Sequence, residues 1–407
     1  MTDKLKMFQK RRSGNRDSDL RFLKLSCWMI FLLGFESGGF QLALLKIARE
    51  FDITNTEMGG LVSVQFLAMM TMPVIFGALA DIVGKKKILL WFSQIFTVGC
   101  IATIVAPSYI GIVLGIFCIG SGYSVCESVL TASLFDEYPQ KGTSYAGWTQ
   151  CCFSIGAVTG PLICDLMIKC GIGDWRNVFY LMAGCYAVNG VLLFKLPMKQ
   201  QELRIRKKWG IRTLKGLTCR SMVDNVLKYA PNSVIPCFVL MICYVGIETG
   251  IAYFLDSFLN LELNAPSSSS KILASFWLFM IPGRIFCGKI AKKANKALVI
   301  CFVSILILLF GWQNCRNINM FAVLICCFGV SCGMVWPMLM GMANSRAQGL
   351  SGRVSGLMTM GSGIGGALWP VVFGKLMDVD GIRNSLWMLI VTGGTAILIL
   401  MVQRRQV

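Results

Sequence analysis

Residues 77–87 read GALADIVGKKK and connect two apolar runs, residues 57–80 and 88–106. An α-helix needs about 20 apolar residues to cross the ~30 Å hydrocarbon core of a bilayer, so each run is long enough to span a membrane. The polar connection then lies at one membrane surface, where it places a carboxylate and three lysines beside two glycines. The same alternation of long apolar runs and short polar turns continues in both directions along the chain.

Twelve such runs occur in the 407 residues, of which 55% are hydrophobic and 14% charged, and the mean hydropathy is +0.66. A chain in lipid must satisfy its backbone hydrogen bonds internally, and runs this long and continuous differ from the ~10-residue alternating strands of a membrane barrel. The sequence therefore predicts an all-α membrane protein with twelve transmembrane helices. The expected spans are 25–47, 57–80, 88–106, 109–133, 146–168, 177–196, 234–258, 270–291, 297–313, 318–342, 354–377 and 385–402.

The basic residues are distributed unevenly between the two expected membrane surfaces. All but eight of the 39 Lys and Arg residues fall in the termini and in the connections that share their side, with Arg284 counted in the turn after the eighth span. By the positive-inside rule, both termini are expected in the cytoplasm, with the protein in a plasma membrane (the inner membrane of a bacterium). The expected parts are a basic tail (1–24), a six-helix half (25–196), a basic connector (197–233), a second six-helix half (234–402) and a short tail (403–407).

The net charge of +19 follows this membrane topology rather than a nucleic-acid site. The basic tail and connector either meet anionic lipid headgroups or serve only as topology signals. A cleaved signal peptide is not expected, because the first apolar run is too long and no small-residue cleavage site follows it. We expect the protein to be a monomer in the bilayer with no nucleic-acid partner.

Several classes of function lack support in the sequence. No stretch of enzyme size remains outside the spans, and no G-x-x-x-x-G-K-[ST] motif for ATP is present. The chain has no histidine, and most of its 18 cysteines fall inside spans, where a free cysteine behaves as a small apolar side chain. We therefore expect no enzymatic activity, no cofactor and no metal, and an ion gradient as the source of energy.

The two halves of the chain resemble one another. GFESG at 34–38 recurs as GIETG at 246–250, and WRNVFYLM at 175–182 corresponds to IRNSLWML at 382–389. Five such matches occur in the same order at offsets of 207–212 residues, and they include Glu127 opposite Trp336. Parallel six-helix repeats are a transporter architecture in which the substrate site lies near the midplane, between the halves.

GALADIVGKKK resembles the cytoplasmic loop signature of the major facilitator superfamily, in which a Gly is followed by an Asp four residues on, a Gly three later and a basic cluster. Gly77 permits close helix approach and Gly84 a tight turn, while Asp81 can pair with basic groups or cap a neighbouring helix N-terminus when the cytoplasmic side is closed. In the second copy Lys292 replaces Asp81 and Asn295 replaces Gly84, so we expect that copy to carry less of the gating. The basic residues of the motif, expected to face headgroups, are Lys85, Lys86 and Lys87.

Further stretches resemble the fucose/glucose permease branch of proton-coupled sugar importers. That branch carries an acidic residue in its fourth helix, matched by Glu127, and an aspartate in its first, where this chain has Gln41 with Glu36 nearby. The departure in the first helix leaves both substrate and coupling open. The stretches that carry the resemblance are GSGYSVCESVL (120–130), YVGIETG (244–250), WPMLMGMA (336–343) and GSGIGGALWPVVFGKLMD (361–378).

The resemblance implies a secondary transporter that moves a small polar solute, a sugar or an organic metabolite, by alternating access and proton symport. A proton-linked drug or metabolite exporter is the alternative, although the fourth span lacks the arginine usual in such antiporters and GAVTGP (156–161) matches only half of their fifth-helix pattern. A membrane sensor that binds a metabolite without moving it is a third possibility, which the intact gate motif disfavours.

The fold of this family places the first, fourth, seventh and tenth helices innermost, so Glu36, Glu127 and Glu248 are expected to face the central cavity. Burial and neighbouring carboxylates both favour the protonated form of a carboxyl group, so such residues can carry a proton. The alternative for each is a protonated residue that only locks helices together. Tyr123, Ser124 and Thr131 share the helical face of Glu127, and Ser154 accompanies Gln150. The candidate site residues are Glu127, Glu36, Glu248, Tyr123, Tyr244, Gln150, Gln41 and Trp336.

Overall fold

The computed structural model describes residues 2–53, 55–195, 231–264, 269–346 and 350–405, and within these ranges the chain forms helices and turns without a strand. The predicted all-α fold class is confirmed. The helices of the first half are α1 (Thr2–Glu50), α2 (Asn55–Val83), α3 (Lys85–Val105), α4 (Tyr109–Glu137), α5 (Gly142–Lys169) and α6 (Asn177–Lys195). Those of the second half are α9 (Pro231–Leu261), α10 (Ser269–Ile290), the 3-10 turn η3 (Ala291–Lys293), α11 (Ala294–Gln313), α12 (Ile318–Gly333), α13 (Val335–Ser345) and α14 (Ser351–Arg405).

Ten stretches of the described chain are long and apolar enough to cross a membrane. One of them, Ala274–Gln313, contains most of α10 and all of α11, and the expected span 25–47 lies within α1, outside these ten. The described parts of the twelve predicted spans therefore fall on helices, with the span 318–342 divided between α12 and α13. Residues 197–230 of the expected connector 197–233 lie outside the described residues. The expected tail 1–24 belongs to α1 from residue 2, and its side chains are described from Leu20 onward.

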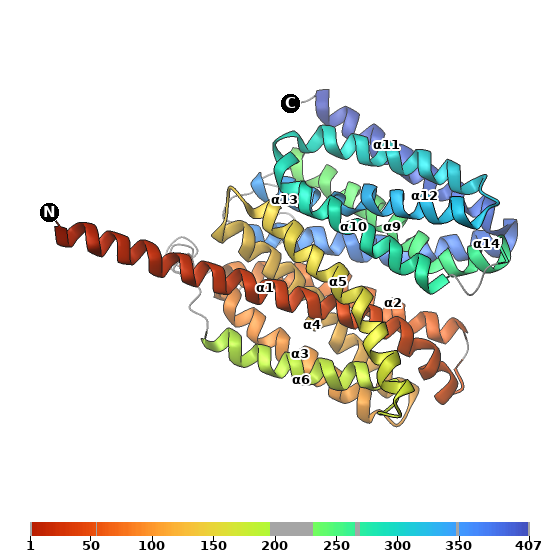
Figure 1. The fold of residues 1–407 in the computed structure, drawn as a ribbon, viewed down its shortest axis with the longest axis horizontal. Helices are drawn as coiled ribbons and strands as arrows, with labels where there is room; N and C mark the ends of the chain where they lie inside the picture. The colour runs from red at the N-terminus through yellow and green to blue at the C-terminus, as the bar shows by residue number, and fades with distance from the viewer. Residues whose placement is uncertain (1, 54, 196–230, 265–268, 347–349, 406–407) are drawn as a thin grey trace.

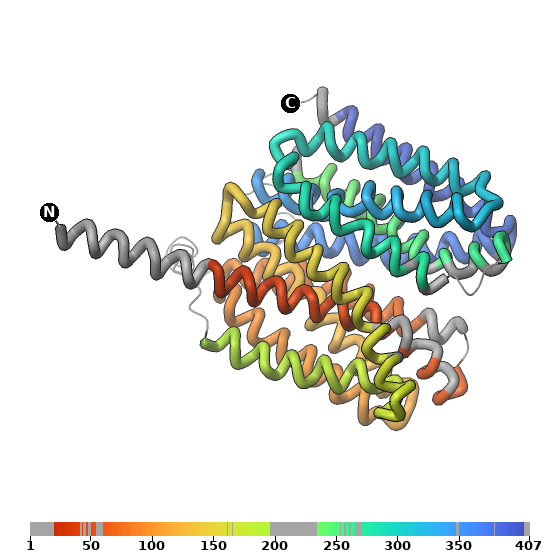
Figure 2. The backbone as a smooth tube through the Cα atoms, in the orientation of Figure 1, coloured from red at the N-terminus to blue at the C-terminus, as the bar shows by residue number. Residues whose placement is uncertain are grey.

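The helices form two groups, α1–α6 and α9–α14, which lie side by side with their axes roughly parallel (Figure 1). The backbone tube in Figure 2 shows the same division between the red-to-green first half and the green-to-blue second half. Each group is built around its own hydrophobic core, one from residues 22–193 and the other from residues 234–400. The two six-helix halves predicted from the internal repeat are thus separately packed bodies.

The first half is closed at one end by Arg176, which lies just before α6. Its Nη2 donates to Glu50 Oε1 over 2.6 Å, and its Nε donates to the carbonyl oxygen of Ile104 over 3.1 Å. The guanidinium carbon also lies 4.2 Å from the ring centroid of Trp175, whose indole donates to Glu50 over 2.5 Å. One side chain therefore ties together the ends of α1, α3 and α6. We call this group of contacts the first outer clasp.

Arg383 makes the corresponding contacts in the second half. Its Nε donates to Glu262 Oε2 over 2.5 Å, its Nη1 donates to the carbonyl oxygen of Gln313, and its Nη2 donates to that of Cys315 over 2.9 Å. The arginine, the glutamate and the first carbonyl stand 207, 212 and 209 residues after those of the first clasp. The offsets match those of the sequence repeat, so this second outer clasp reproduces the repeat in three dimensions.

Two helix boundaries differ from the expected spans. The expected span 318–342 is divided into two helices, α12 and α13, with the break at Met334. The backbone N–H of Met338, four residues later, donates to the carbonyl oxygen of Met334. Pro337 explains the break, because proline has no N–H and its ring pushes against the carbonyl four residues earlier, that of Gly333. The last two spans are joined in one element, α14, but Gly381 adopts a φ of 79° between them, which separates two helices as the sequence predicts.

Candidate functional site

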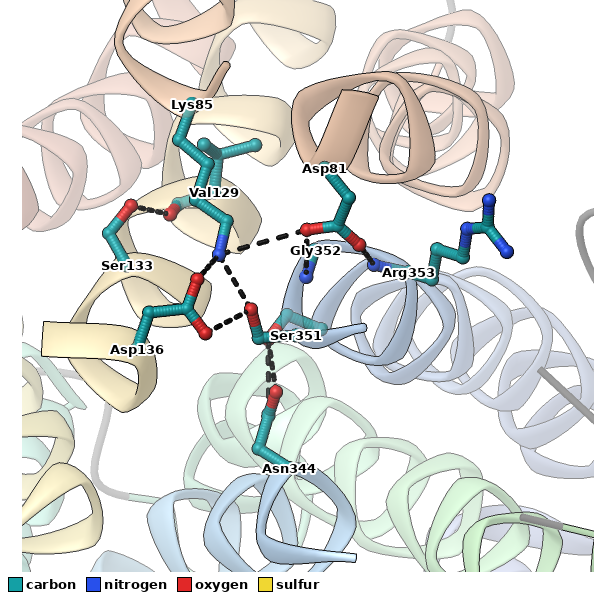
Figure 3. Close-up of polar contacts among 10 residues, drawn as sticks. Asp81, Lys85, Val129, Ser133, Asp136, Asn344, Ser351, Gly352 and Arg353 are labelled. Carbon is teal, nitrogen blue, oxygen red and sulfur yellow. Dashed lines mark hydrogen bonds and ion pairs between the residues drawn. The ribbon is translucent and has the colours of Figure 1, made fainter. Parts of the chain in front are cut away.

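Asp81 lies near the end of α2 and contacts the first turn of α14 in the opposite half. Its two carboxylate oxygens accept hydrogen bonds from the backbone N–H groups of Gly352 and Arg353, each over 3.0 Å (Figure 3). Backbone N–H groups at a helix N-terminus have no partner within the helix and carry partial positive charge, so a carboxylate is well suited to them. Gly77 lies one turn earlier, where a Cβ would collide with the Gly352 carbonyl oxygen.

Lys85 departs from the expectation that the basic cluster faces headgroups. It is 8% exposed, and its Nζ forms an ion pair with Asp136 of α4, donates to Ser351 Oγ over 2.6 Å, and lies 3.7 Å from Asp81 Oδ1 (Figure 3). Ser351 Oγ in turn donates to Asp136 over 2.6 Å. Two carboxylates within reach attract the ammonium inward, so the prediction was wrong for Lys85. Asp81, Lys85, Asp136 and Ser351 are called the gate network below.

The other residues of the motif lie where the turn requires them. Gly84 precedes α3 with a φ of 103°, a conformation that favours glycine over residues with a Cβ. Lys86 donates to the carbonyl oxygen of Phe194 at the end of α6 over 2.9 Å, and Lys87 is exposed. The motif therefore faces two ways, with Asp81 and Lys85 toward the second half and Lys86 toward its own half.

The second copy of the motif makes the close approach but not the cap. A Cβ on Gly288 would collide with the side chain of Ser144 on α5, just as Gly77 approaches α14. Lys292, which replaces Asp81, lies in η3, and the N-terminus of α5, at Lys141, has no side-chain cap. Among the described residues, the interface between the halves is thus close-packed on both sides, with an acidic cap at the N-terminus of α14 and none at that of α5.

Glu36 lies in the middle of α1 and is completely buried. Its carboxylate oxygens both accept from Gln65 Nε2 of α2, each over 3.2 Å. The residues on its own helical face are Leu32, Gly39 and Phe40, which have no polar side chain, so the partner comes from another helix. Within the described residues Glu36 makes no ion pair.

Glu127 lies on α4 with 7% of its surface exposed. Gln150 Nε2 of α5 donates to its Oε1 over 3.3 Å, so two predicted site residues are in direct contact. Tyr123, one turn earlier, is buried beside it and close enough to interact electrostatically with both Glu127 and Glu36. Ser124 and Thr131 are buried on the same helix, and Ser124 donates to the backbone oxygen of Ser121 over 3.4 Å.

Glu248 lies on α9 and is partly buried, with the hydroxyl of Tyr244 in reach of its carboxylate. That hydroxyl donates to the carbonyl oxygen of Cys332 on α12 over 3.1 Å. Tyr244 therefore joins α9 to α12 within the second half, as the bond between Glu36 and Gln65 joins α1 to α2 in the first.

Arg284 of α10 is the functional candidate that the sequence analysis missed. It is 3% exposed and lies between the halves, where its guanidinium donates to the backbone oxygen of Gln150 and, over 2.7 Å, to Ser154 Oγ. It also interacts electrostatically with Glu127 and Glu248. The signal was present, because an arginine inside the apolar run 270–291 is costly in lipid and hence a candidate site residue; it was assigned instead to the basic turn that follows.

The remaining candidates are less informative. The side chain of Gln41 lies outside the described residues. Trp336, at the position equivalent to Glu127, is 8% exposed and packs in the hydrophobic core of the second half. The structure thus brings Glu127, Gln150, Glu248 and Arg284 to one region where both halves meet.

The structure has a buried group of charged residues between two six-helix bundles and an acidic cap near one end. The sequence also matches a known family. The profile of the Major Facilitator Superfamily matches residues 27–370. The chain belongs to this superfamily. As its members are transporters, it is a membrane transport protein and not an enzyme.

Individual members of the superfamily show limited identity to this chain. The multidrug transporter AQR1 of Candida glabrata is 29% identical over 165 residues, which cover 40% of this chain and only 27% of AQR1. The sialic acid transporter NanX of Escherichia coli is 23% identical over 386 residues, which cover 91% of each chain.

The crystal structure of the fucose:proton symporter FucP of Escherichia coli superposes with a TM-score of 0.74 at 13% identity, covering 94% of this chain and 98% of FucP. This likeness shows a shared fold, in agreement with the resemblance to the fucose permease branch.

Proposed function

We propose that this chain is a proton-coupled symporter that moves a small polar solute across the membrane by alternating access. The observation that carries the proposal is the state of its buried carboxylates: Glu127 and Glu36 each accept hydrogen bonds from a neutral glutamine and form no ion pair within the described residues. An isolated buried carboxylate is costly, and taking up a proton removes that cost. Glu127 is the proposed proton- or substrate-binding residue because it lies beside Gln150 and Arg284 at the interface.

The gate network supports the alternating-access part of the proposal. The cap on α14 by Asp81 and the contacts of Lys85 join the halves at the end expected to be cytoplasmic. The close glycine contacts between halves, from Gly77 with Gly352 to Gly366 with Phe66, continue along α2 and α14. Opening toward that end must break these bonds, so solute and proton have to favour the open state by at least as much free energy.

The similar proteins leave the solute and the direction open. NanX is named as a sialic acid transporter and FucP as a fucose:proton symporter, which favours an importer of a polar solute. AQR1 is named as a multidrug transporter, so a proton-linked exporter is the second candidate. The buried polar groups around Glu127 favour a polar solute over an apolar drug.

Transport in proteoliposomes tests the proposal. Candidate sugars and organic acids would first be screened by thermal shift, and those that stabilise the protein tested for counterflow and for uptake driven by an imposed pH gradient. We expect counterflow without a gradient and accumulation only with one. Asp380→Asn, which removes an exposed carboxylate outside the site, is the control for Glu127→Gln. Binding without counterflow would indicate a sensor, and accumulation in cells that rises on adding an uncoupler would indicate an exporter.

A further inference from the structure

The guanidinium of Arg284 is held on one side only. Its Nη1 donates to the Gln150 carbonyl and to Ser154 Oγ, which anchors the group on α5 in the opposite half. The ring of Phe153, with its centroid 5.8 Å from the guanidinium carbon, lies beside it. These contacts fix the orientation of a side chain that is 3% exposed.

The opposite edge of the same group has no oxygen acceptor in the described chain. Nε makes no hydrogen bond there, and Nη2 reaches only the sulfur of Met280, at 3.9 Å, which is a weak acceptor. The N–H bonds on this edge point in parallel from a planar group. Two parallel donors at this spacing match the two oxygens of a carboxylate.

The charge of Arg284 is also incompletely balanced. Glu127 and Glu248 interact with it electrostatically, but neither forms a direct ion pair with it in the part of the chain that the structure describes. When these glutamates carry protons, the guanidinium becomes a buried cation without a counter-charge, which is unfavourable. The other titratable groups that interact with Arg284 are Tyr123, Cys151, Tyr244, Cys287 and Cys332.

We propose that the Nε–Nη2 edge of Arg284 binds the carboxylate of a small organic anion, and that this anion is the transported solute. The inference rests on the proposed transport function and specifies its substrate class. An anion supplies both the acceptor atoms and the negative charge that the site lacks, whereas a neutral sugar supplies only hydroxyl acceptors. Protons on Glu127 and Glu248 remove competing negative charge, so proton and anion bind cooperatively.

Matched acid and neutral probes test this proposal on the full-length protein. Glucuronate would be compared with glucose, galacturonate with galactose, and lactate with lactamide, by thermal shift and by counterflow in proteoliposomes. We expect only the acids to stabilise the protein and to exchange. Arg284→Lys keeps the charge but removes the paired donors, and we expect it to weaken acid binding by about tenfold to a hundredfold. Lys289→Gln, which removes an exposed charge from the same helix, should leave binding unchanged.

Each outcome separates the binding site from the transport function. Equal binding of an acid and its neutral partner, or acid binding that survives in a folded Arg284→Lys variant, overturns the role of Arg284 while counterflow still supports transport. Acid binding that depends on Arg284 without any counterflow supports the site and overturns the proposed transport. The melting temperature of each variant without probe shows whether it is folded; if Arg284→Lys unfolds, Ser154→Ala serves instead, because it loosens the anchor of Nη1 and should weaken acid binding selectively.

Discussion

The two halves are alike at one end and unlike at the other. At the ends closed by the outer clasps, Arg176 and Arg383 make the same kinds of contact, each with a glutamate at the end of the first helix of its half or just after it, and with a backbone oxygen at the end of the third. At the other end, Asp81 caps α14, while its counterpart Lys292 leaves the N-terminus of α5 without a side-chain cap. The difference shows that the contacts within each half are repeated, whereas the acidic cap between the halves is present at one of the two equivalent positions and absent from the other.

The contact between the halves is asymmetric in its charges but not in its shape. Close glycine packing is present on both sides, at Gly77 and at Gly288, so shape alone does not distinguish them. The charges do, because Asp81 caps α14 on one side, whereas the N-terminus of α5 on the other side has no side-chain cap. Under the proposed alternating-access function, a cap that is made in one facing state and broken in the other is a two-state element that both solute and proton can bias.

The largest effect is expected at the equivalent positions Glu127 and Trp336. Glu127→Gln cannot carry a proton, so we expect uptake driven by a pH gradient to disappear while counterflow is retained. One proton over two pH units supports a concentration ratio of about 100, since each unit is a factor of ten, and the variant should show no accumulation. Trp336→Phe, which keeps the packing of a buried aromatic, should change accumulation little.

Uptake in proteoliposomes with a trapped pH dye gives both readings. Accumulation by Glu127→Gln at the level of the native protein would remove this residue from the coupling. Glu36→Gln would then be the next variant to measure, because that carboxylate is completely buried with only Gln65 as its partner.

The next largest effect is expected when Asp81 is compared with its counterpart Lys292. Asp81→Asn removes the charge that two backbone N–H groups of α14 contact, and hydrogen bonds to a charged group contribute about 1.5–3 kcal/mol each at most. We expect the gate end to open more often and the transport rate to fall about tenfold or more. Lys292→Asn removes a charge at the equivalent position without breaking a cap, and should alter the rate by less than about twofold.

Accessibility of a cysteine placed near the gate would report opening directly. Labelling is expected to rise in Asp81→Asn and to stay at the native level in Lys292→Asn. Equal effects of the two substitutions on rate and labelling would show that the copies share the gating, against the asymmetry described here.

Both outer clasps should contribute to stability, but to different extents. Arg176→Gln removes ion pairs with Glu50 and Asp174 and the donor to one backbone oxygen, whereas Arg383→Gln removes one ion pair and the donors to two backbone oxygens. An unpaired backbone oxygen costs about 1–3 kcal/mol in buried settings and less where water has access. We expect both variants to melt several degrees lower, and Arg383→Gln to be the more severe because two carbonyl oxygens lose their donor. Thermal melts in detergent measure this, and a variant that melts like the native protein would exclude its clasp from holding the half together.

Much of the fold could be predicted from the sequence, because span length is set by bilayer thickness and is read from apolar runs. The contact residues Asp81 and Gly77 could be singled out in the same way, since they belong to a local motif, and their gating role stays a prediction. The internal repeat even predicted which arginines would correspond, through the match of 175–182 with 382–389. Features set by local sequence were therefore accessible.

Contacts between segments that are distant in the sequence could not be predicted. Lys85 was expected at the headgroups because its neighbours in sequence are lysines, but the acceptors that turn it inward, Asp136 and Ser351, are 51 and 266 residues away. Arg284 is held by Gln150 and Ser154, more than 100 residues earlier. Which polar side chains meet is decided only by the packing of the two halves. The sequence could therefore nominate the central glutamates, but not the groups that they and Arg284 contact.

The smallest expected effect is the pH dependence of the stability that the first outer clasp contributes. Hydrogen bonds from Arg176 hold the pKa of Glu50 below its ordinary value of 4.5. A carboxyl group with a lowered pKa in the folded state stabilises the fold above its unfolded pKa, and this contribution is lost as the pH falls below about 4.5 through the folded value. Melting temperatures of the native protein and of Glu50→Gln should therefore differ near neutral pH and converge as the pH falls below 4.5 and Glu50 becomes protonated in the folded protein. The difference should be small and reduced by added salt, because the Glu50 side chain is 40% exposed and its ion pair is screened. A gap that widens on acidification would mean that Glu50 is stabilised in its protonated form and that the clasp does not depend on the ion pair.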